Sequence, residues 1–309
     1  MDVEILETVG RTTTVAPPAS ARPSAVGRGG ELVLQGIWKM FGEVGTQGRQ
    51  TALRDIHLTC KPGEFVVVVG PSGCGKSTLL NIASGMIRQD AGGVLLDGVP
   101  KSVPGPDRAM VFQDHGLFPW LTTAQNIGFG LKMMGVPRSE REDRVQDALD
   151  MVHLGQTGRK LVHELSGGMR QRVAIARALV MDPKVLLMDE PFAALDAQTR
   201  TLLHEQLQEI WLRTSKTILF VTHSVGEAVR LADRIIVLHA HPGRIRREIP
   251  IELGHPRNFD HPDLAGLVHL VRREIEEEVN RINAEAGDPW KPQTPDDLDA
   301  AYRNLGGGI

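Results

Sequence analysis

A glycine-rich segment carries the clearest chemistry in this sequence. Residues 70–78 read GPSGCGKST and match the phosphate-binding pattern G-x-x-x-x-G-K-[ST]. Glycines let the backbone N–H groups turn toward phosphate oxygens, and a following helix adds the positive end of its dipole. Lys76 can reach the β- and γ-phosphates, and the hydroxyl of Ser77 can ligate Mg²⁺. The predicted phosphate-binding residues are Gly70, Pro71, Ser72, Gly73, Cys74, Gly75, Lys76, Ser77 and Thr78.

Two neighbouring carboxylates form the second chemical feature. The apolar run at residues 184–188 ends in Asp189 and Glu190, which is the Walker B pattern. Asp189 can hold Mg²⁺ directly or through water. Glu190 can accept a proton from an attacking water molecule. The two motifs together predict that the chain binds a nucleoside triphosphate with Mg²⁺ and hydrolyses it.

Three further side chains stand at the ends of predicted strands. Gln113 ends the strand at residues 108–113, at the sheet edge where nucleotides are contacted. His223 follows the strand at residues 217–222 and could sense the γ-phosphate. Phe41 ends the first strand region, where it is either an aromatic that stacks on adenine or an ordinary core side chain.

A second glycine turn lies far along the chain from the first. Ser166, Gly167 and Gly168 lead into a predicted helix at residues 169–180. The N-terminus of that helix is a second potential anion site. One triphosphate bound to a single chain has no obvious use for two such sites.

The surrounding pattern predicts an α/β fold. The apolar residues 64–69 form a buried strand before the glycine loop, and residues 78–83 form the first turns of a helix after it. Repeated strand–helix units predict a mainly parallel sheet covered on both faces. A small antiparallel β region precedes this sheet, and a helical insertion occupies about residues 114–182. Within that insertion, Ser139 and Glu142 have the spacing of a capping box.

The two ends of the chain differ from its centre. Residues 1–30 are rich in Thr, Ala, Pro, Gly and Arg and are predicted to be a disordered leader. Apolar residues between 264 and 282 form a stripe on a predicted helix whose acidic face carries Glu274 and residues 276–278. This helix either docks on the core or forms a regulatory interface. His239 and His241 lack a nearby third metal ligand, which favours a solvated loop over a metal site.

Composition excludes several classes of protein. The 309 residues carry a net charge of −3, which does not favour nucleic acid as a partner. The two cysteines, Cys60 and Cys74, do not make a disulfide framework. No apolar run approaches the ~20 residues that a membrane-spanning helix needs, and the N-terminus lacks the pattern of a secretory signal. A membrane role would therefore require a partner.

The complete set of motifs resembles the nucleotide-binding subunit of an ABC transporter. Residues 165–171, LSGGMRQ, match the signature of that family, and Gln113 matches its Q-loop. Residues 194–196 match the D-loop that contains Asp196, and His223 matches the switch histidine. Phe41 falls where the family places its adenine-stacking aromatic. The resemblance implies an ABC-type P-loop domain over residues 31–250, followed by a helical extension at residues 251–309.

This resemblance also gives the second anion site a use. In the family, two subunits associate head to tail, and the signature of one covers the ATP bound by the other. The resemblance implies that Ser166, Gly167, Gly168 and Asp196 complete a partner's site, and that Gln113 contributes to metal binding and catalysis. It further implies membrane permease subunits that dock near Gln113 and residues 117–121, at the cytoplasmic face of the cell membrane.

Shorter motifs suggest a direction of transport. Residues 104–108 (PGPDR), 117–121 (LFPWL) and 242–245 (PGRI) resemble the nitrate, sulfonate, taurine and bicarbonate import group. This group implies a small anion as cargo and a separate solute-binding protein. The alternatives are the ATPase of an exporter or lipid-transport complex, and a non-transport ABC ATPase. The second ATPase subunit is either a copy of this chain or a paralogue.

Overall fold

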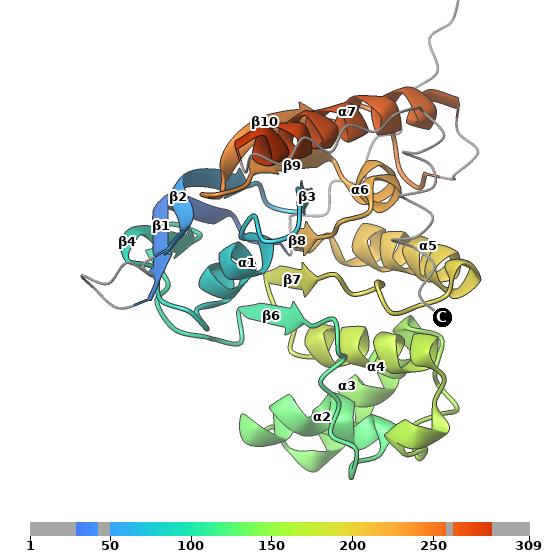
Figure 1. Cartoon of the computed structure of the whole chain (residues 1–309). Helices are drawn as coiled ribbons and strands as arrows, with labels where there is room; N and C mark the ends of the chain where they lie inside the picture. The colour runs from blue at the N-terminus through green and yellow to red at the C-terminus, as the bar shows by residue number, and fades with distance from the viewer. Residues whose placement is uncertain (1–28, 43–49, 258–261, 286–309) are drawn as a thin grey trace, which may run out of the picture.

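The computed structural model describes residues 29–42, 50–257 and 262–285 (Figure 1). The predicted leader, except for residues 29 and 30, lies outside the described residues. The part of the predicted C-terminal extension beyond residue 285 lies outside them as well. In the segments that the structure describes, no helix combines the length and hydrophobicity needed to cross a membrane.

An antiparallel sheet opens the fold, as the sequence predicts. Its strands are β1 (Leu32–Phe41), β2 (Gln50–Cys60), β4 (Ala91–Leu96) and β5 (Val99–Pro100), in the order β2-β1-β4-β5. Leu32, Leu34 and Ile37 of β1 are fully or almost fully buried, and several intervening side chains are more exposed. This partial alternation is typical of a sheet with one face on the core.

The second sheet has six strands. They are β3 (Phe65–Val69), β6 (Arg108–Val111), β7 (Val185–Asp189), β8 (Thr217–Val221), β9 (Arg234–His239) and β10 (Arg244–Pro250). The order is β10-β9-β3-β8-β7-β6, and only β10 pairs antiparallel. Every residue of β3 and β8 is buried, as expected for a parallel sheet covered on both faces.

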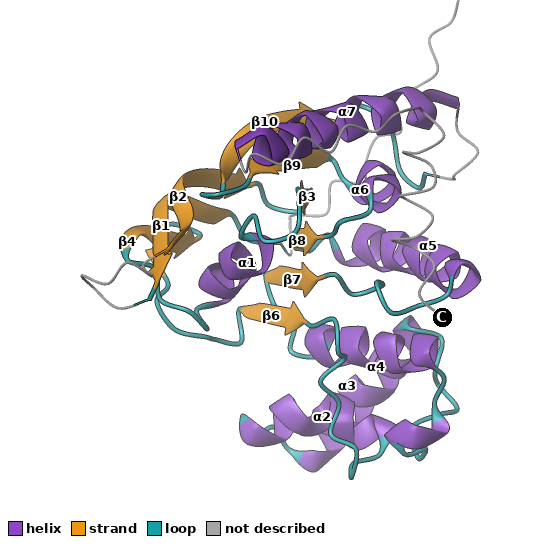
Figure 2. Cartoon of the chain, in the orientation of Figure 1, coloured by secondary structure: helices purple, strands orange, loops and turns teal. Residues whose placement is uncertain are grey.

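Side chains on the two faces of β3 enter different cores. Val66 and Val68 pack with the antiparallel sheet and α1 (Lys76–Ser84). Phe65, Val67 and Val69 pack toward the face covered by α5 (Ala197–Thr214), α6 (Val225–Leu231) and α7 (Pro262–Glu285). Figures 1 and 2 show α1 on one side of the parallel strands and α5 and α6 on the other. The predicted P-loop fold class is confirmed.

A helical region extends from the end of β6. It contains α2 (Thr123–Met133), α3 (Arg138–Met151), a short 3₁₀ turn (Val162–Glu164) and α4 (Gly167–Leu179), all within the predicted insertion at about 114–182. The predicted capping box at Ser139 and Glu142 is wrong. Helix α3 begins one residue earlier, so Ser139 lies inside its first turn, and Glu142 accepts from Arg138 instead. A capping box forms at Thr122 and Gln125.

Helix α7 docks along β9 and β10 (Figure 1). Leu264 and Val271 are buried, which agrees with the docking alternative for the apolar stripe. The expected acidic face is wrong in part, because Glu274 and Glu278 are also buried. They pair with arginines of β10 and of α7 itself, whereas Glu277 is half exposed.

The side chain of Thr217 links the start of β8 to Gly30, which precedes β1, and to Gly63, which precedes β3. Its hydroxyl donates to the carbonyl of Gly30 at 2.6 Å and accepts from the Gly63 amide at 3.0 Å. Thr217 has no exposed surface. Because Gly63 lies two residues before β3, this hydroxyl helps to fix the strand that leads into the glycine loop.

Replacing Thr217 with Val keeps the β-branched shape but leaves a buried amide and carbonyl without this partner. We expect the free energy of unfolding to fall by about 2 kcal/mol, within the range for unsatisfied buried polar groups. Urea unfolding should show a lower midpoint with an unchanged slope. Thr201→Val is the matched control, since its hydroxyl only bonds the Ala197 carbonyl on a helix surface. A midpoint for Thr217→Val equal to that of the control would contradict this role.

Candidate active site

The glycine loop joins the end of β3 to the start of α1. Gly75 caps α1 with φ of 97°, and a Cβ atom there would lie 2.6 Å from a methyl group of Leu53. Only glycine fits this position without displacing Leu53. The first turn of α1 contains no acidic residue, so its N–H groups and positive dipole end are available to an anion.

Lys76 lies at the centre of the loop. The ammonium group donates to the carbonyl of Gly70 at 2.8 Å and to that of Pro71 at 2.9 Å. Only 7% of this residue is exposed. A buried ammonium needs such partners, and phosphate oxygens can take their place or join them. The loop therefore presents a fixed positive charge beside the helix N-terminus.

A cavity of about 350 Å³ opens over this loop. Phe41, Lys76 and Glu190, which are far apart in the sequence, all contribute to its wall. The other predicted residues that line it are Ser72, Gly73, Gly75, Ser77 and Thr78. Phe41 is 44% exposed, which excludes the alternative of a core side chain. Its stacking on adenine stays a prediction.

Ser77 and Asp189 meet at one side of the cavity. The Ser77 hydroxyl donates to Asp189 Oδ1 at 3.1 Å. Partial burial raises the pKa of Asp189 above its ordinary value, and the Ser77 hydrogen bond opposes that rise. No cluster of three or more His, Cys, Asp or Glu suited to a metal occurs among the described residues. One hydroxyl and one carboxylate nevertheless fit Mg²⁺, which is held by few protein oxygens together with substrate phosphates.

Glu190 and His223 form a hydrogen-bonded pair. Glu190 Oε2 lies 2.8 Å from His223 Nδ1. This hydrogen bond is the main cause that lowers the pKa of Glu190 and raises the pKa of His223. Glu190 also has a left-handed backbone, with φ of 42°, and its amide donates to Val221 of β8. Such strained backbone is concentrated at functional sites.

The signature turn and Asp196 lie together on a different surface. Ser166 caps α4 by accepting from the Met169 amide, and Asp196 caps α5 by accepting from the Thr199 amide. A Cβ atom on Gly168 would lie 2.5 Å from a methyl group of Thr199, so the two helix starts are in close contact. Neither Asp196 nor residues 166–168 line the cavity.

Gln113 is a predicted site residue that lies outside the cavity lining. Gln113 is exposed just beyond β6, beside the strand that ends at Asp189, and it does not line the cavity. Its metal and catalytic roles stay predictions.

Cys74 is buried, and this burial raises the pKa of its thiol, which makes the thiol poorly reactive. The structure thus agrees with a small packing residue at position 74.

Sequence reasoning missed four residues of the cavity wall. Gln50, Thr51 and Ala52 come from β2, and His241 comes from the turn after β9. A histidine beside Pro242-Gly243 was visible in the sequence, but only the fold shows that this turn reaches the glycine loop. His239 is the last residue of β9 and pairs with Glu278, so the expected solvated loop is wrong for it. His241 lies exposed in the turn after β9, as expected for a solvated loop, and also lines the cavity.

Comparisons with known proteins agree with this geometry. Residues 53–193 match the ABC transporter family. An uncharacterised ABC transporter ATP-binding protein of Methanocaldococcus jannaschii is 48% identical over 228 residues, covering 74% of this chain and 85% of the relative. The nitrate import ATP-binding protein NrtD of Synechocystis is 50% identical over 68% of this chain and 79% of the relative. The taurine import ATP-binding protein TauB of Pseudomonas putida is 46% identical over 65% and 77%.

A solved structure shares the fold. The ATP-binding cassette MJ0796, in a dimeric post-hydrolysis state bound to ADP and Pi, superposes with a TM-score of 0.62. Its sequence is 32% identical, and the match covers 71% of this chain and 98% of that chain. With the phosphate loop, the carboxylate pair and the signature all present, this chain belongs to the ABC transporter family and is an ATP-hydrolysing ATP-binding cassette.

Proposed function

We propose that this cassette drives import of a small anion, as one of two ATPase subunits attached to a membrane permease at the cytoplasmic face. The observation that carries the proposal is the separation of its two anion sites. The cavity is lined by Lys76, Ser77 and Glu190, whereas residues 166–168 of the signature turn do not line it. A second subunit, placed head to tail, would bring a signature to each cavity.

Five residues in or beside the cavity have roles in the proposed hydrolysis. Lys76 and the N-terminus of α1 bind the phosphate chain and stabilise its negative charge. Ser77 and Asp189 would hold Mg²⁺, which neutralises charge on the β- and γ-phosphates. Glu190 accepts the proton of the attacking water. Before ATP binds, His223 holds the Glu190 carboxylate through their 2.8 Å hydrogen bond.

The state of the Glu190–His223 pair controls how well Glu190 accepts a proton. While His223 holds the carboxylate, the lowered pKa makes Glu190 a weaker base. When the His223 hydrogen bond moves to the γ-phosphate, Glu190 regains a higher pKa and becomes a better acceptor. The pair therefore links recognition of the γ-phosphate to activation of water.

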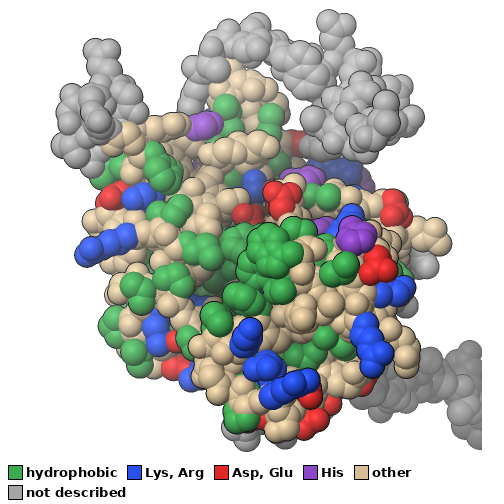
Figure 3. All heavy atoms as spheres, turned by 90° about the horizontal axis from the view of Figure 1, so that it is seen from below, with side chains coloured by type: hydrophobic (Ala, Val, Ile, Leu, Met, Phe, Trp, Pro, Cys, Tyr) green, Lys and Arg blue, Asp and Glu red, His purple; other side chains and the backbone are tan. Residues whose placement is uncertain are grey.

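An apolar cavity on the helical region supports permease docking. It measures about 770 Å³ and is lined by residues of α2, α3 and the segment that precedes α2. Trp120 at its wall is 72% exposed. The charged lining residues are Lys132, Arg138, Arg141, Arg159 and one acid, Glu142, so the lining is positive overall. Figure 3 shows hydrophobic side chains gathered on this lower face with Lys and Arg around them. A short amphipathic helix with acidic ends would complement such a surface.

The proposal that the cargo is a small anion is supported by the names of two relatives, and not by any contact in this structure. NrtD is named for nitrate import and TauB for taurine import. Both cargoes are small and carry an anionic group, and a solute-binding protein would deliver such a cargo to the permease. Exporter, lipid-transport and non-transport roles are the alternatives, and the proteins that bind this chain distinguish them.

The permease proposal is tested with tagged full-length chain captured from detergent-solubilised membranes of its host. We expect a multi-spanning membrane protein to co-purify. Trp120→Asp should strongly reduce its recovery, because a charge would enter the apolar cavity. Val103→Asp is the matched control, since Val103 is 67% exposed and lies away from α2 and α3. Recovery of soluble proteins alone, or equal recovery with both variants, would contradict the proposed docking.

Replacing Glu190 with Gln removes the proton acceptor and keeps the shape of the side chain. ATP binding should persist, while steady-state hydrolysis falls about 10²-fold or more, as for loss of a general base. The raised pKa of His223 should move back toward its ordinary value, because the charged partner is gone. In the unmodified protein, the His223–Glu190 ion pair therefore persists at pH values above the ordinary histidine pKa. The variant has no carboxylate at position 190 and cannot form this ion pair.

Phosphate release and an NMR titration of the His223 ring provide the two readouts. Glu140→Gln is the control, because Glu140 lies on the surface of α3 and pairs only with Arg144 among the described contacts. It should leave both readouts unchanged. Near-normal hydrolysis in Glu190→Gln would remove Glu190 as the base.

A further inference from the structure

The turn between β9 and β10 lies against the phosphate loop. The Gly243 amide donates to the carbonyl of Ala52 at 2.9 Å, and the Arg54 amide donates to the carbonyl of Gly243 at 2.9 Å. A Cβ atom on Gly243 would lie 2.2 Å from the Cys74 carbonyl oxygen. Any other residue at 243 would push the turn away from the loop, so glycine permits this close approach.

His241 occupies the exposed side of this turn and faces the nucleotide cavity. It lines the cavity together with Phe41 and Gly73. Its Cε1 atom lies 3.9 Å from the position that a Cβ atom on Gly73 would take. The imidazole is therefore adjacent to the phosphate loop, where its nitrogens can reach a phosphate oxygen as hydrogen-bond donors. Its backbone is left-handed, with φ of 53°, a conformation that neighbouring contacts must maintain.

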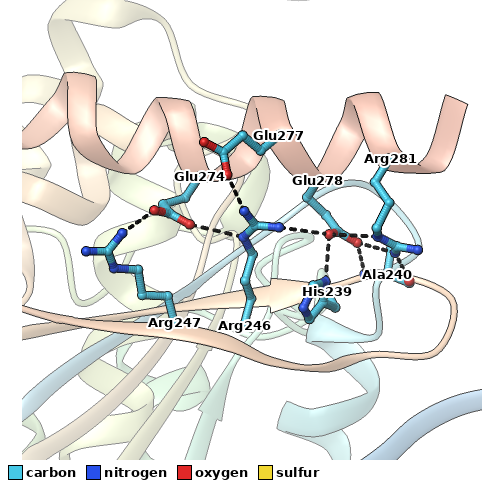
Figure 4. A network of polar contacts seen from close by, with 8 residues as sticks. All are labelled: His239, Ala240, Arg246, Arg247, Glu274, Glu277, Glu278 and Arg281. Atoms are coloured by element: carbon cyan, nitrogen blue, oxygen red, sulfur yellow. Dashed lines mark hydrogen bonds and ion pairs between the residues drawn. The ribbon is translucent and has the colours of Figure 1, made fainter. Parts of the chain in front are cut away.

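Those neighbouring contacts come from α7. Glu278 Oε1 accepts from the Ala240 amide at 2.9 Å, and Arg281 donates to the Ala240 carbonyl at 2.8 Å. Glu278 Oε2 lies 2.6 Å from His239 Nδ1. Figure 4 shows α7 above the β9–β10 turn with Glu278 and Arg281 pointing down to Ala240. Both polar backbone groups of the residue before His241 are thus bonded to one helix.

Glu278 is itself held firmly in place. Its side chain has no exposed surface, and it also pairs with Arg281 at 2.5 Å and with Arg246 at 3.4 Å. Burial acts to raise the pKa of Glu278, but hydrogen bonds from Arg281, the Ala240 amide and His239 lower it to about 2. Glu274 and Glu277 bind the remaining donors of Arg246, and Glu274 also binds Arg247 (Figure 4). The carboxylate therefore stays ionised at neutral pH and holds the turn continuously.

We infer that His241 contacts the phosphate chain of ATP, and that Glu278 and Arg281 of α7 are positioning residues that hold His241 in place through Ala240. This inference rests on ATP binding in the cavity described above. It assigns α7 a role in nucleotide affinity in addition to its packing on the core. A change that displaces α7 would then weaken ATP binding without touching the cavity.

The test is calorimetric titration of the full-length chain with the non-hydrolysable analogue AMPPNP and Mg²⁺. His241→Ala should raise the Kd about fivefold, the effect of losing one modest hydrogen bond. Glu278→Gln should raise it by a similar factor, because the turn is no longer held. Glu277→Gln is the matched control. It lies on the same helix, removes the same charge and is 53% exposed, so the Kd should not change.

A double-mutant cycle separates positioning from general destabilisation. If Glu278 acts through His241, Glu278→Gln should have no further effect on the Kd in a His241→Ala background. Should Glu278→Gln fail to fold, Arg281→Gln removes the second contact to Ala240 and replaces it in the cycle. Additive effects of the two changes would refute the positioning role of α7.

Lys76→Ala distinguishes failure of the His241 inference from failure of the proposed ATP binding in this cavity. An unchanged Kd in His241→Ala, with binding lost in Lys76→Ala, would refute the inference and leave ATP binding in this cavity intact. An unmodified chain that does not bind the analogue would refute the assignment of the cavity itself.

Discussion

The pairing of β8 between β3 and β7 is the constraint on which the site depends. Hydrogen bonds fix the register of these parallel strands, so that Val68 lies opposite Val221 and Val221 lies opposite Asp189. Their carboxyl ends therefore reach the same edge of the sheet. The glycine loop follows β3, Glu190 follows β7 and His223 lies just beyond β8. Segments more than a hundred residues apart thus meet around one cavity, without any long loop to position them.

The same architecture places the cavity and the signature turn on different elements of the fold. The cavity belongs to the parallel sheet and to β1 and β2, whereas the signature turn belongs to α4 and contacts the start of α5. Because Ser166 and Asp196 are helix caps, their positions are set by the helices that they begin. The cavity and the signature turn of a single chain are therefore separate features, since neither residues 166–168 nor Asp196 line the cavity. In the proposed head-to-tail pair, hydrolysis depends on contact between subunits, and the helical region that docks the permease would move with the signature.

Much of this arrangement was predictable from the sequence, and the exceptions have physical causes. The glycine loop, the carboxylate pair and the strands are local patterns, so Lys76, Asp189 and Glu190 could be placed on their elements. The hydrogen bonds from Ser77 to Asp189 and from His223 to Glu190 depend on strand order, which no local pattern records. The buried state of Glu274 and Glu278 could not be predicted from the sequence. A run of glutamates usually indicates a solvated face, and only the fold shows that Arg246 and Arg247 of β10 lie opposite this part of α7. The position of His241 at the cavity could not be predicted for the same reason, since only the fold brings its turn to the glycine loop.

In the proposed head-to-tail dimer, the cavity of one copy and the signature of another form one ATP site. The most direct measurement is crosslinking of two differently tagged copies, one with Ser72→Cys and one with Ser166→Cys, both carrying Glu190→Gln. The native thiols Cys60 and Cys74 are buried and should not interfere. We predict that a short bis-maleimide joins the two tagged copies only when ATP is present. Failure to crosslink with ATP bound and both introduced thiols reactive would contradict the shared site, as would crosslinks that join only Ser166→Cys copies to each other.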